Sequence, residues 1–249
     1  MMPLGVLLMA YGSPATLDDV EAYYTHIRGG KSPAPAAVQE LKERYRRIGG
    51  RSPLLEITQA QAAGVEALLR QRGVPVRVWV GMKHAPPFIA EAVAQMDAGG
   101  IRQAAGVALA PHYSKMSVGG YIAAATSAEA QHGMEIRCLE HYHDHPGLVR
   151  AFADRIEVAR RSVHGGRRVP VVFTAHSLPQ RILQWSDPYP DQLRRTCALV
   201  ASEAGIETWR FAFQSASHTG EPWLGPDVLD VLRELHEQGS REVIVSPVG

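Results

Sequence analysis

Imidazole, hydroxyl and amide side chains follow five of the short apolar runs in this sequence. The five segments are Tyr11-Gly12-Ser13-Pro14, Lys83-His84-Ala85-Pro86, Pro111-His112-Tyr113-Ser114, His176-Ser177-Leu178-Pro179 and Gln214-Ser215. An imidazole with a pKa near neutrality can accept a proton or bind a transition metal. The three histidines, with Tyr11 and Tyr113, therefore favour a metal or proton-transfer site, although a hydrogen-bonded loop residue stays an open interpretation of His112.

Between residues 23 and 53, arginines are interspersed with tyrosines close to two pairs of glycines. The group contains Tyr23, Tyr24, His26, Arg28, Arg44, Tyr45, Arg46, Arg47, Arg51 and Ser52. Guanidinium groups bind carboxylates through paired, charge-assisted hydrogen bonds and also stack on aromatic rings. This combination suits a flat aromatic ligand that carries carboxylates. For Arg46 and Arg47 we favour a solvated helix face, whereas both interpretations are open for Arg28 and Arg51.

Three histidines alternate in the segment His141-Tyr142-His143-Asp144-His145-Pro146. In an extended segment this spacing would place three imidazoles on one side, as a metal site requires. The alternative is a set of exposed histidines before a helix that begins at Pro146. We favour the exposed histidines and leave the metal site open, and nearby Cys138 is expected to be an ordinary thiol.

Each of these side chains must be positioned by a strand or a helix, and the apolar pattern indicates which. Short runs rich in Val, Ile and Leu alternate with longer segments of helical period, which is typical of an α/β fold with parallel sheets. The predicted strands are Gly5–Ala10, Val76–Val80, Ala105–Ala110, Met134–Leu139, Val169–Thr174, Trp209–Phe213 and Glu242–Ser246. Because ligands bind outside the carboxyl ends of such strands, the polar segments lie where a site is expected.

Apolar residues recur at helical spacing in three of the intervening segments. They are Phe88, Ile89, Ala92, Val93 and Met96; Leu148, Phe152 and Ile156; and Val228, Val231, Leu232 and Leu235. A basic, glycine-containing run at Arg160–Arg168 is the predicted linker, because the strand-helix alternation restarts after it. We therefore predict two similar α/β domains, residues 1–163 and residues 164–249, the second carrying His176.

The composition excludes several classes of protein. The chain has 249 residues, of which 45% are apolar and 20% charged, with a net charge of +1. This balance is typical of globular proteins and disfavours nucleic acid as a partner. The longest apolar stretch, Met1–Tyr11, is shorter than the roughly 20 residues that cross a bilayer and lacks a basic leader, so we expect a cytoplasmic protein without a transmembrane segment.

The sequence also lacks the usual signals of organic cofactors and of metal clusters. No glycine-rich phosphate-binding motif follows a predicted strand, which disfavours NAD, FAD and ATP. Cys138 and Cys197 are too few for a disulfide framework and show no CxxC spacing, so we expect both to be buried thiols.

Eight segments, in order along nearly the whole chain, resemble the ferrochelatases. They are Leu7-Leu8-Met9-Ala10-Tyr11-Gly12-Ser13-Pro14, Tyr23-Tyr24-Thr25-His26-Ile27-Arg28, Arg44-Tyr45 with Ile48-Gly49-Gly50-Arg51-Ser52-Pro53-Leu54, Gly81-Met82-Lys83-His84, Ala110-Pro111-His112-Tyr113-Ser114, Ala175-His176-Ser177-Leu178-Pro179, Asp187-Pro188-Tyr189-Pro190-Asp191-Gln192-Leu193 and Pro222-Trp223-Leu224-Gly225-Pro226-Asp227. The first two segments are most similar to the coproporphyrin III ferrochelatases of Gram-positive bacteria.

The resemblance implies two Rossmann-like domains whose parallel sheets face a cleft, the chelatase-type fold, in which ferrous iron is inserted into a porphyrin. It implies that His176 handles both metal and protons, that Tyr11 contacts the iron of the product, and that His84 is a further catalytic residue. The residues matched to porphyrin binding are Tyr11, Arg28, Arg44, Tyr45, Ser52 and Tyr121.

The function implied is insertion of Fe²⁺ into coproporphyrin III, giving Fe-coproporphyrin III in haem biosynthesis. Fe²⁺ and the porphyrin are then the substrates of a lyase that has no organic cofactor and no iron-sulfur cluster, and we expect a monomer. The alternatives are a protoporphyrin IX ferrochelatase, a non-catalytic tetrapyrrole-binding protein and, less favoured, a cobalt chelatase of related fold.

The family that the sequence resembles continues beyond the segment matched by Ser246-Pro247-Val248-Gly249. Its members carry there an acidic residue opposite the active-site histidine, a further strand and a C-terminal helix. We therefore expect the second domain to be truncated here, and a chain that ends at Gly249 to be inactive or nearly so.

Overall fold

The chain divides into two compact units in a computed structural model that describes residues 4–164, 166–217 and 220–249. Unit 1 comprises the described residues up to Leu109 together with Gly120–Leu139. Unit 2 comprises Ala110–Gly119 and the described residues of Glu140–Gly249.

Unit 1 is built on a four-stranded parallel sheet with the strand order β2-β1-β3-β4. The strands are β1 (Leu4–Ala10), β2 (Val76–Met82), β3 (Gln103–Ala108) and β4 (Glu135–Leu139). Strand β1 is central, and its last residue, Ala10, lies opposite Met82, the last residue of β2. The segments that follow β1 and β2 therefore emerge side by side at one edge of the sheet.

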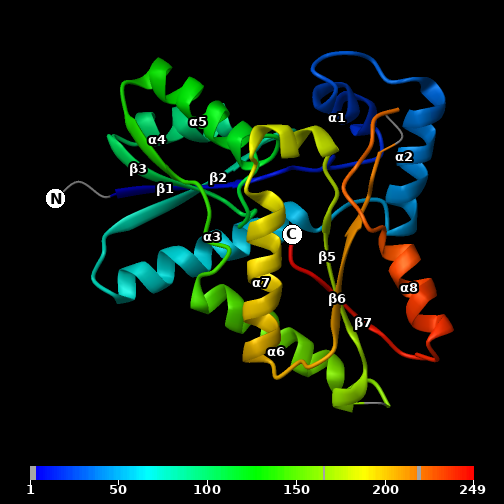
Figure 1. Cartoon of the computed structure of the whole chain (residues 1–249). Helices are drawn as coiled ribbons and strands as arrows, with labels where there is room; N and C mark the ends of the chain where they lie inside the picture. Colours follow the sequence, from blue (N-terminus) through cyan, green and yellow to red (C-terminus); the bar gives the residue numbers. More distant parts are fainter. Residues whose placement is uncertain (1–3, 165, 218–219) are drawn as a thin grey trace. The chain divides into compact units, whose positions relative to one another are not determined.

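Helices cover both faces of this sheet, because successive side chains of a strand point to opposite faces. The helices are α1 (Val20–Ile27), α2 (Pro35–Arg47), α3 (Leu54–Gln71), α4 (Ile89–Ala98) and α5 (Val118–His132). Figure 1 shows α3 on one side of the sheet and α4 and α5 on the other. Val6 and Leu8 pack with Ala62 of α3, whereas glycine at position 5 leaves room for Met96 of α4.

Unit 2 is built on a three-stranded parallel sheet with the order β6-β5-β7. Its strands are β5 (Val171–His176), β6 (Trp209–Gln214) and β7 (Ile244–Pro247). Its helices are α6 (Pro146–Arg160), α7 (Tyr189–Glu203) and α8 (Val228–Glu237), with the 3-10 helices η1 (Gly166–Arg168) and η2 (Gln180–Trp185).

The central strand of unit 2 is buried on both faces. Phe173 has no exposed surface and belongs to the same apolar cluster as residues of α6 and α7, including Ile156 and Leu193. Val172 points the other way and packs with Val231 of α8. This double burial explains why β5 reads as a continuous apolar run.

The α/β prediction is confirmed, and each predicted strand is present with ends that differ by only a few residues. The three helical patterns correspond to α4, α6 and α8. The division between the units differs from the predicted boundary after residue 163, because the apolar face of α6 packs in the core of unit 2. Gly165, in the predicted linker, lies outside the described residues.

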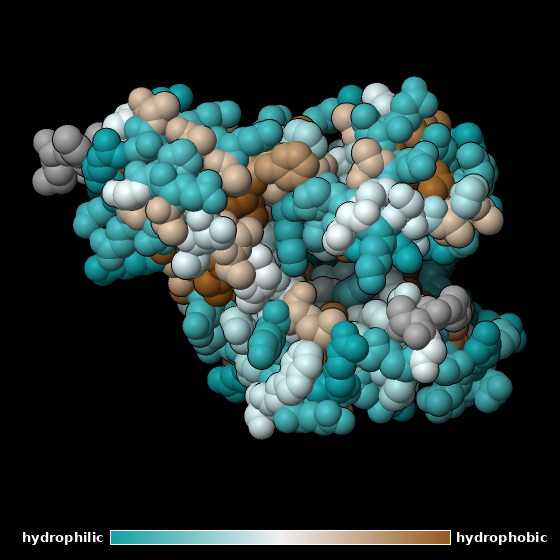
Figure 2. Space-filling model, turned by 90° about the horizontal axis from the view of Figure 1, so that it is seen from above, coloured by the Kyte–Doolittle hydropathy of each residue, from teal (hydrophilic) through white to brown (hydrophobic). Residues whose placement is uncertain are grey.

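Polar residues dominate the face of the molecule drawn in Figure 2, where apolar residues are exposed only in small separate areas. Among the described residues, no helix combines the length and the apolar character needed to cross a membrane.

Candidate functional site

Tyr11 and His84 lie side by side because they follow neighbouring parallel strands. The backbone N–H of His84 donates to the carbonyl oxygen of Tyr11 at 2.9 Å, and that of Lys83 donates to Ala10 at the same distance. The two rings are in contact, with centroids 4.6 Å apart. Tyr11 is 44% exposed, so its phenol remains accessible to a ligand. The structure thus brings together two of the predicted site residues.

Gly12, which follows Tyr11, allows the chains after β1 and β2 to approach closely. Its φ of +94° lies in the left-handed region, and a Cβ at this position would lie 2.9 Å from the backbone nitrogen of Ala85. The Tyr23 hydroxyl donates to its carbonyl oxygen at 3.2 Å. Only glycine meets both requirements without displacing the loop that carries His84.

Gly12→Ala is expected to lower the free energy of unfolding by about 2–5 kcal/mol, the sum of the left-handed strain and the overpacking. Gly49→Ala is the matched control, since its φ of +90° is similar but nothing lies within 4 Å of an added Cβ. That control should lose only about 1–2 kcal/mol. Thermal unfolding of both variants measures the difference, and equal losses would show that the contact with Ala85 is unimportant.

A cavity of 530 Å³ lies in unit 1 next to this pair of strand ends. Its walls come from the segment after β1, from α1, from the start of α3 and from the loop after β2. The lining residues are Ser13, Pro14, Ala15, Asp19, Ala22, Tyr23, His26, Arg51, Ser52, Leu55, Glu56, His84, Ala85, Pro86 and Phe88. The cavity therefore combines aromatic and apolar surface with hydrogen-bonding groups, as a site for an amphipathic ring ligand requires.

Two histidines meet in the wall of the cavity. The Nδ1 atoms of His26 and His84 are 3.1 Å apart, so one imidazole donates and the other accepts. The His26 ring also stacks on Phe88, with centroids 5.2 Å apart. Burial, helped by the charges of Lys83 and His26, lowers the pKa of His84 to about 4. His84 is therefore neutral at physiological pH and can act as a hydrogen-bond acceptor or a base.

Four phenols of unit 1 influence one another's ionisation: Tyr11, Tyr23, Tyr45 and Tyr121. Burial is the main cause that raises the pKa of each above its ordinary value. All four hydroxyls therefore stay protonated at neutral pH and can donate hydrogen bonds. The Lys83 ammonium lies 5.1 Å from the centre of the Tyr121 ring, and burial lowers the pKa of this lysine.

The predicted porphyrin-binding arginines occupy exposed positions outside the cavity lining. The guanidinium of Arg28 lies 5.9 Å from the centre of the Tyr24 ring, and that of Arg44 pairs with Glu40 at 2.5 Å. Ser52 does line the cavity, and its Oγ accepts a hydrogen bond from the Leu54 backbone at the start of α3. Of the residues matched to porphyrin binding, Ser52 thus lines the cavity, and Tyr11 contacts His84, which also lines it.

Tyr23, His26, Arg51 and Phe88 line the cavity but are not among the predicted site residues. The first three belong to the basic and aromatic group noted in the sequence, which is the signal that identifies them. Phe88 was assigned to a helix face, and it precedes α4, where its ring stacks on His26.

In unit 2, His176 ends β5 with an exposed side chain. Its carbonyl oxygen accepts a hydrogen bond of 3.0 Å from the Tyr189 hydroxyl, and the following Ser177 donates to Leu224 at 2.8 Å. Partial removal of the ring from water lowers the pKa of His176 below its ordinary value. The imidazole is therefore neutral at pH 7, and hydrogen bonds at His176 and at Ser177 fix the position of this segment.

His112 has a structural environment in the core of unit 2, where it is 2% exposed. Its Nε2 lies 2.8 Å from the Thr196 hydroxyl, whose single proton is donated to the His143 carbonyl oxygen, so His112 is the donor. Burial lowers the pKa of His112 to about 3 and keeps the ring neutral. This arrangement matches the interpretation of His112 as a hydrogen-bonded loop residue.

Comparison with known proteins identifies relatives along the full chain. The Ferrochelatase family model matches residues 3–249. The coproporphyrin III ferrochelatase of Bacillus subtilis (strain 168) is 42% identical, over 99% of this chain and 81% of that protein. The ferrochelatase of Deinococcus radiodurans is also 42% identical, over 99% of this chain and 80% of its own length.

A solved structure supports the fold. The cobalt complex of the sirohydrochlorin chelatase SirB from Bacillus subtilis subspecies spizizenii aligns with a TM-score of 0.51 at 11% identity, covering 100% of this chain and 88% of that one. At this level of identity the likeness concerns the fold alone.

Proposed function

The chain belongs to the ferrochelatase family, and from this premise we propose that it inserts Fe²⁺ into coproporphyrin III to give Fe-coproporphyrin III in haem biosynthesis. The observation that carries the proposal is the 42% identity, over 99% of the chain, with a relative named for this porphyrin. A second relative with that name, from Oceanobacillus iheyensis, is 41% identical over the same share.

The residues of unit 1 are suited to hold the porphyrin in this proposal. The cavity offers aromatic and apolar surface for the ring, and the Tyr23 and Ser52 hydroxyls, His26 and Arg51 lie in its walls. Guanidinium and hydroxyl groups bind propionate oxygens through directed hydrogen bonds. Tyr11, Arg28, Arg44, Tyr45 and Tyr121 complete the proposed binding set, with the arginines exposed and able to turn towards propionates at the rim.

His176 is the proposed base and metal ligand. Insertion of Fe²⁺ replaces two pyrrole N–H protons, so the reaction releases two protons for each iron bound. A neutral imidazole has a lone pair that can accept such a proton or hold the metal ion. The lowered pKa of His176 keeps that lone pair available at neutral pH.

His84 is the proposed catalytic residue of unit 1, and Tyr11 is the proposed residue of unit 1 that contacts iron. His84 is neutral, in contact with the Tyr11 ring and hydrogen-bonded to His26, so a proton accepted by one imidazole can pass to the next. The Tyr11 hydroxyl is proposed to approach the iron of the product.

The proposal needs no organic cofactor, because Fe²⁺ and the porphyrin are both substrates. It also includes no iron-sulfur cluster: such clusters need about four cysteine ligands, and this sequence has Cys138 and Cys197 only. A monomer acting in the cytoplasm is part of the same proposal, and light scattering of the purified protein tests the oligomeric state.

We expect coproporphyrin III, with four propionates, to bind more tightly than protoporphyrin IX, with two. Each additional charge-assisted hydrogen bond contributes about 1.5–3 kcal/mol before desolvation. After that cost, we expect a Kd at least tenfold lower, which corresponds to about 1.4 kcal/mol.

Titration of both porphyrins by absorption, together with initial rates of iron insertion, measures this preference. Equal affinities would contradict the expected preference, and reversed affinities would favour protoporphyrin IX as the substrate. Binding of both porphyrins without any iron insertion would instead favour the non-catalytic tetrapyrrole-binding protein.

A further inference from the structure

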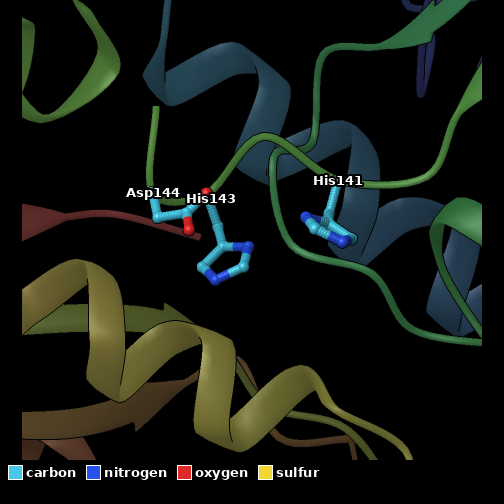
Figure 3. A group of neighbouring side chains, drawn as sticks. All are labelled: His141, His143 and Asp144. Atoms are coloured by element: carbon cyan, nitrogen blue, oxygen red, sulfur yellow. The ribbon is translucent and has the colours of Figure 1, made fainter. Parts of the chain in front are cut away.

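A group of side chains of the types that bind metals lies in unit 2, and none of its members is assigned to iron insertion. It consists of His141, His143 and Asp144, in the loop between β4 and α6. One ligand atom from each residue lies within 4.8 Å of the other two. Figure 3 shows the His143 ring between the other two side chains, with a ring nitrogen on the side that faces His141.

His143 is the buried member of this group, at 8% exposure. Its Nδ1 atom is buried and has no hydrogen-bond partner among the described residues. The His141 ring is the nearest imidazole, with its centroid 5.0 Å away. A buried polar atom without a partner is unfavourable, so a group that accepts its lone pair would stabilise this arrangement.

Charged groups of both signs lie near His143. Burial is the main cause that lowers the pKa of this imidazole. The Asp144 carboxylate acts in the opposite direction and is the largest of the neighbouring charges, ahead of His141 and Arg195. Arg195 is exposed, and its positive charge opposes a bound metal ion.

The backbone of the group is fixed before any ion binds. The Thr196 hydroxyl donates to the His143 carbonyl oxygen at 2.8 Å, and the Tyr142 N–H donates to Pro111 at 3.0 Å. The His145 N–H closes a turn by donating to the Tyr142 carbonyl oxygen at 3.1 Å. Because of this turn, the segment is not extended.

The turn changes which residues come together. His145 points away from the group: it is the N-cap of α6, and its Nδ1 accepts a hydrogen bond of 3.1 Å from the Gly147 N–H. Asp144 takes the third place instead. The alternating histidines of the sequence therefore contribute two imidazoles and a carboxylate rather than three imidazoles.

We propose that His141, His143 and Asp144 bind a divalent first-row transition-metal ion at a site separate from the iron-insertion site. Imidazole nitrogen and carboxylate oxygen together suit Zn²⁺, Co²⁺ and Fe²⁺. Tetrahedral ligands about 2.1 Å from a metal lie roughly 3.4 Å apart, so the side chains must close up slightly. His141 and Asp144 are exposed and free to do so.

The proposed site has three protein ligands, which leaves a coordination position for water. Two of these ligands are exposed, so the ion is expected to exchange with solution rather than to be trapped during folding. The proposal does not rest on the function proposed above, because none of the three residues belongs to the set assigned to iron or porphyrin.

Titration of the untagged protein with Co²⁺ tests the proposal, because the visible absorption of Co²⁺ reports nitrogen and oxygen ligands. The His176→Ala background removes the proposed iron ligand, so that binding elsewhere is observed. We expect one Co²⁺ per chain, displaced by Zn²⁺. His141→Ala and Asp144→Asn, both at exposed positions, should each raise the Kd at least tenfold.

Two further variants distinguish this site from other histidines. His145→Asn keeps a capping residue on α6 and should leave Co²⁺ binding unchanged. Arg195→Gln removes the opposing charge and should lower the Kd. Absence of Co²⁺ binding in the His176→Ala background would overturn the proposal, as would binding that His141→Ala and Asp144→Asn leave intact. Equal weakening by His145→Asn would also overturn it.

Discussion

In a version of the protein extended through the C-terminal segment that the family carries, His176→Ala is expected to reduce iron insertion by at least a hundredfold while porphyrin still binds. The imidazole ends β5 with an exposed side chain, and the Tyr189 hydroxyl holds its backbone rather than its ring. Removing the ring therefore removes the proposed base and metal ligand but no packing contact in the core. General base catalysis alone contributes about 10²–10⁴-fold, which sets the expected size of the loss.

Initial rates of metal insertion and a porphyrin titration by absorption, on the same preparation, separate the two effects. His164→Ala is the matched control, because this histidine of unit 2 has a side chain that is 99% exposed. It should insert iron at the wild-type rate. If His176→Ala kept that rate, the assignment of His176 would be wrong, whereas joint loss of porphyrin binding and of the folded state would indicate a structural role.

The same residue predicts how the rate depends on pH. The pKa of His176 is lowered by partial burial, so the neutral form persists below the ordinary histidine value of 6.5. The rate should therefore fall on acidification with a midpoint below pH 6.5. A wild-type profile with its midpoint above pH 6.5 would show that another group controls the reaction.

The strands could be predicted from the sequence because each is a short apolar run. The clustering of the polar residues that follow them could also be predicted, because parallel strands place their carboxyl ends at one edge of the sheet. Tyr11 and His84 illustrate this: both follow a run, and the pairing of β1 with β2 brings them into contact. No local sequence pattern predicts the strand order β2-β1-β3-β4. It follows from packing between segments far apart in the chain.

Contacts between distant residues were beyond the reach of sequence patterns. His26 and His84 are 58 positions apart, and only the packing of α1 beside the loop after β2 makes them partners. The unit boundary failed for a similar reason. A glycine-containing basic run is typical of a linker. However, the apolar face of α6, which precedes this run, packs in the core of unit 2 and so places the helix in that unit.

Local hydrogen bonds also change the arrangement of side chains that the histidine spacing predicts. The alternation of His141, His143 and His145 would align three imidazoles only in an extended chain. The turn closed by the His145 N–H and the cap that its ring makes on Gly147 place it elsewhere. A histidine directly before a proline at the first position of a helix is a signal for this outcome.

Asp187→Ala is expected to destabilise unit 2 by about 3–5 kcal/mol, as removal of a buried charged partner does. Asp187 is 9% exposed. Its carboxylate accepts hydrogen bonds from the Ser114 hydroxyl at 3.0 Å, the Lys115 N–H at 2.8 Å and the Tyr189 N–H at 3.1 Å. Alanine would leave two backbone donors and a hydroxyl without an acceptor in a buried position.

Thermal unfolding should show the loss as a decrease of roughly 10 °C, since 1 kcal/mol shifts the Tm of a chain of this size by about 2–4 °C. Asp191→Ala is the matched control, because its carboxylate pairs with Arg194 at the surface and its side chain is 86% exposed. It should change the Tm by about 1–2 °C at most. Asp187→Asn keeps one acceptor oxygen and should fall between the two. Equal melting of Asp187→Ala and Asp191→Ala would mean that the segment containing Ser114 is held by other contacts, of which the 2.7 Å hydrogen bond from the Tyr113 N–H to Gln192 is the first to remove.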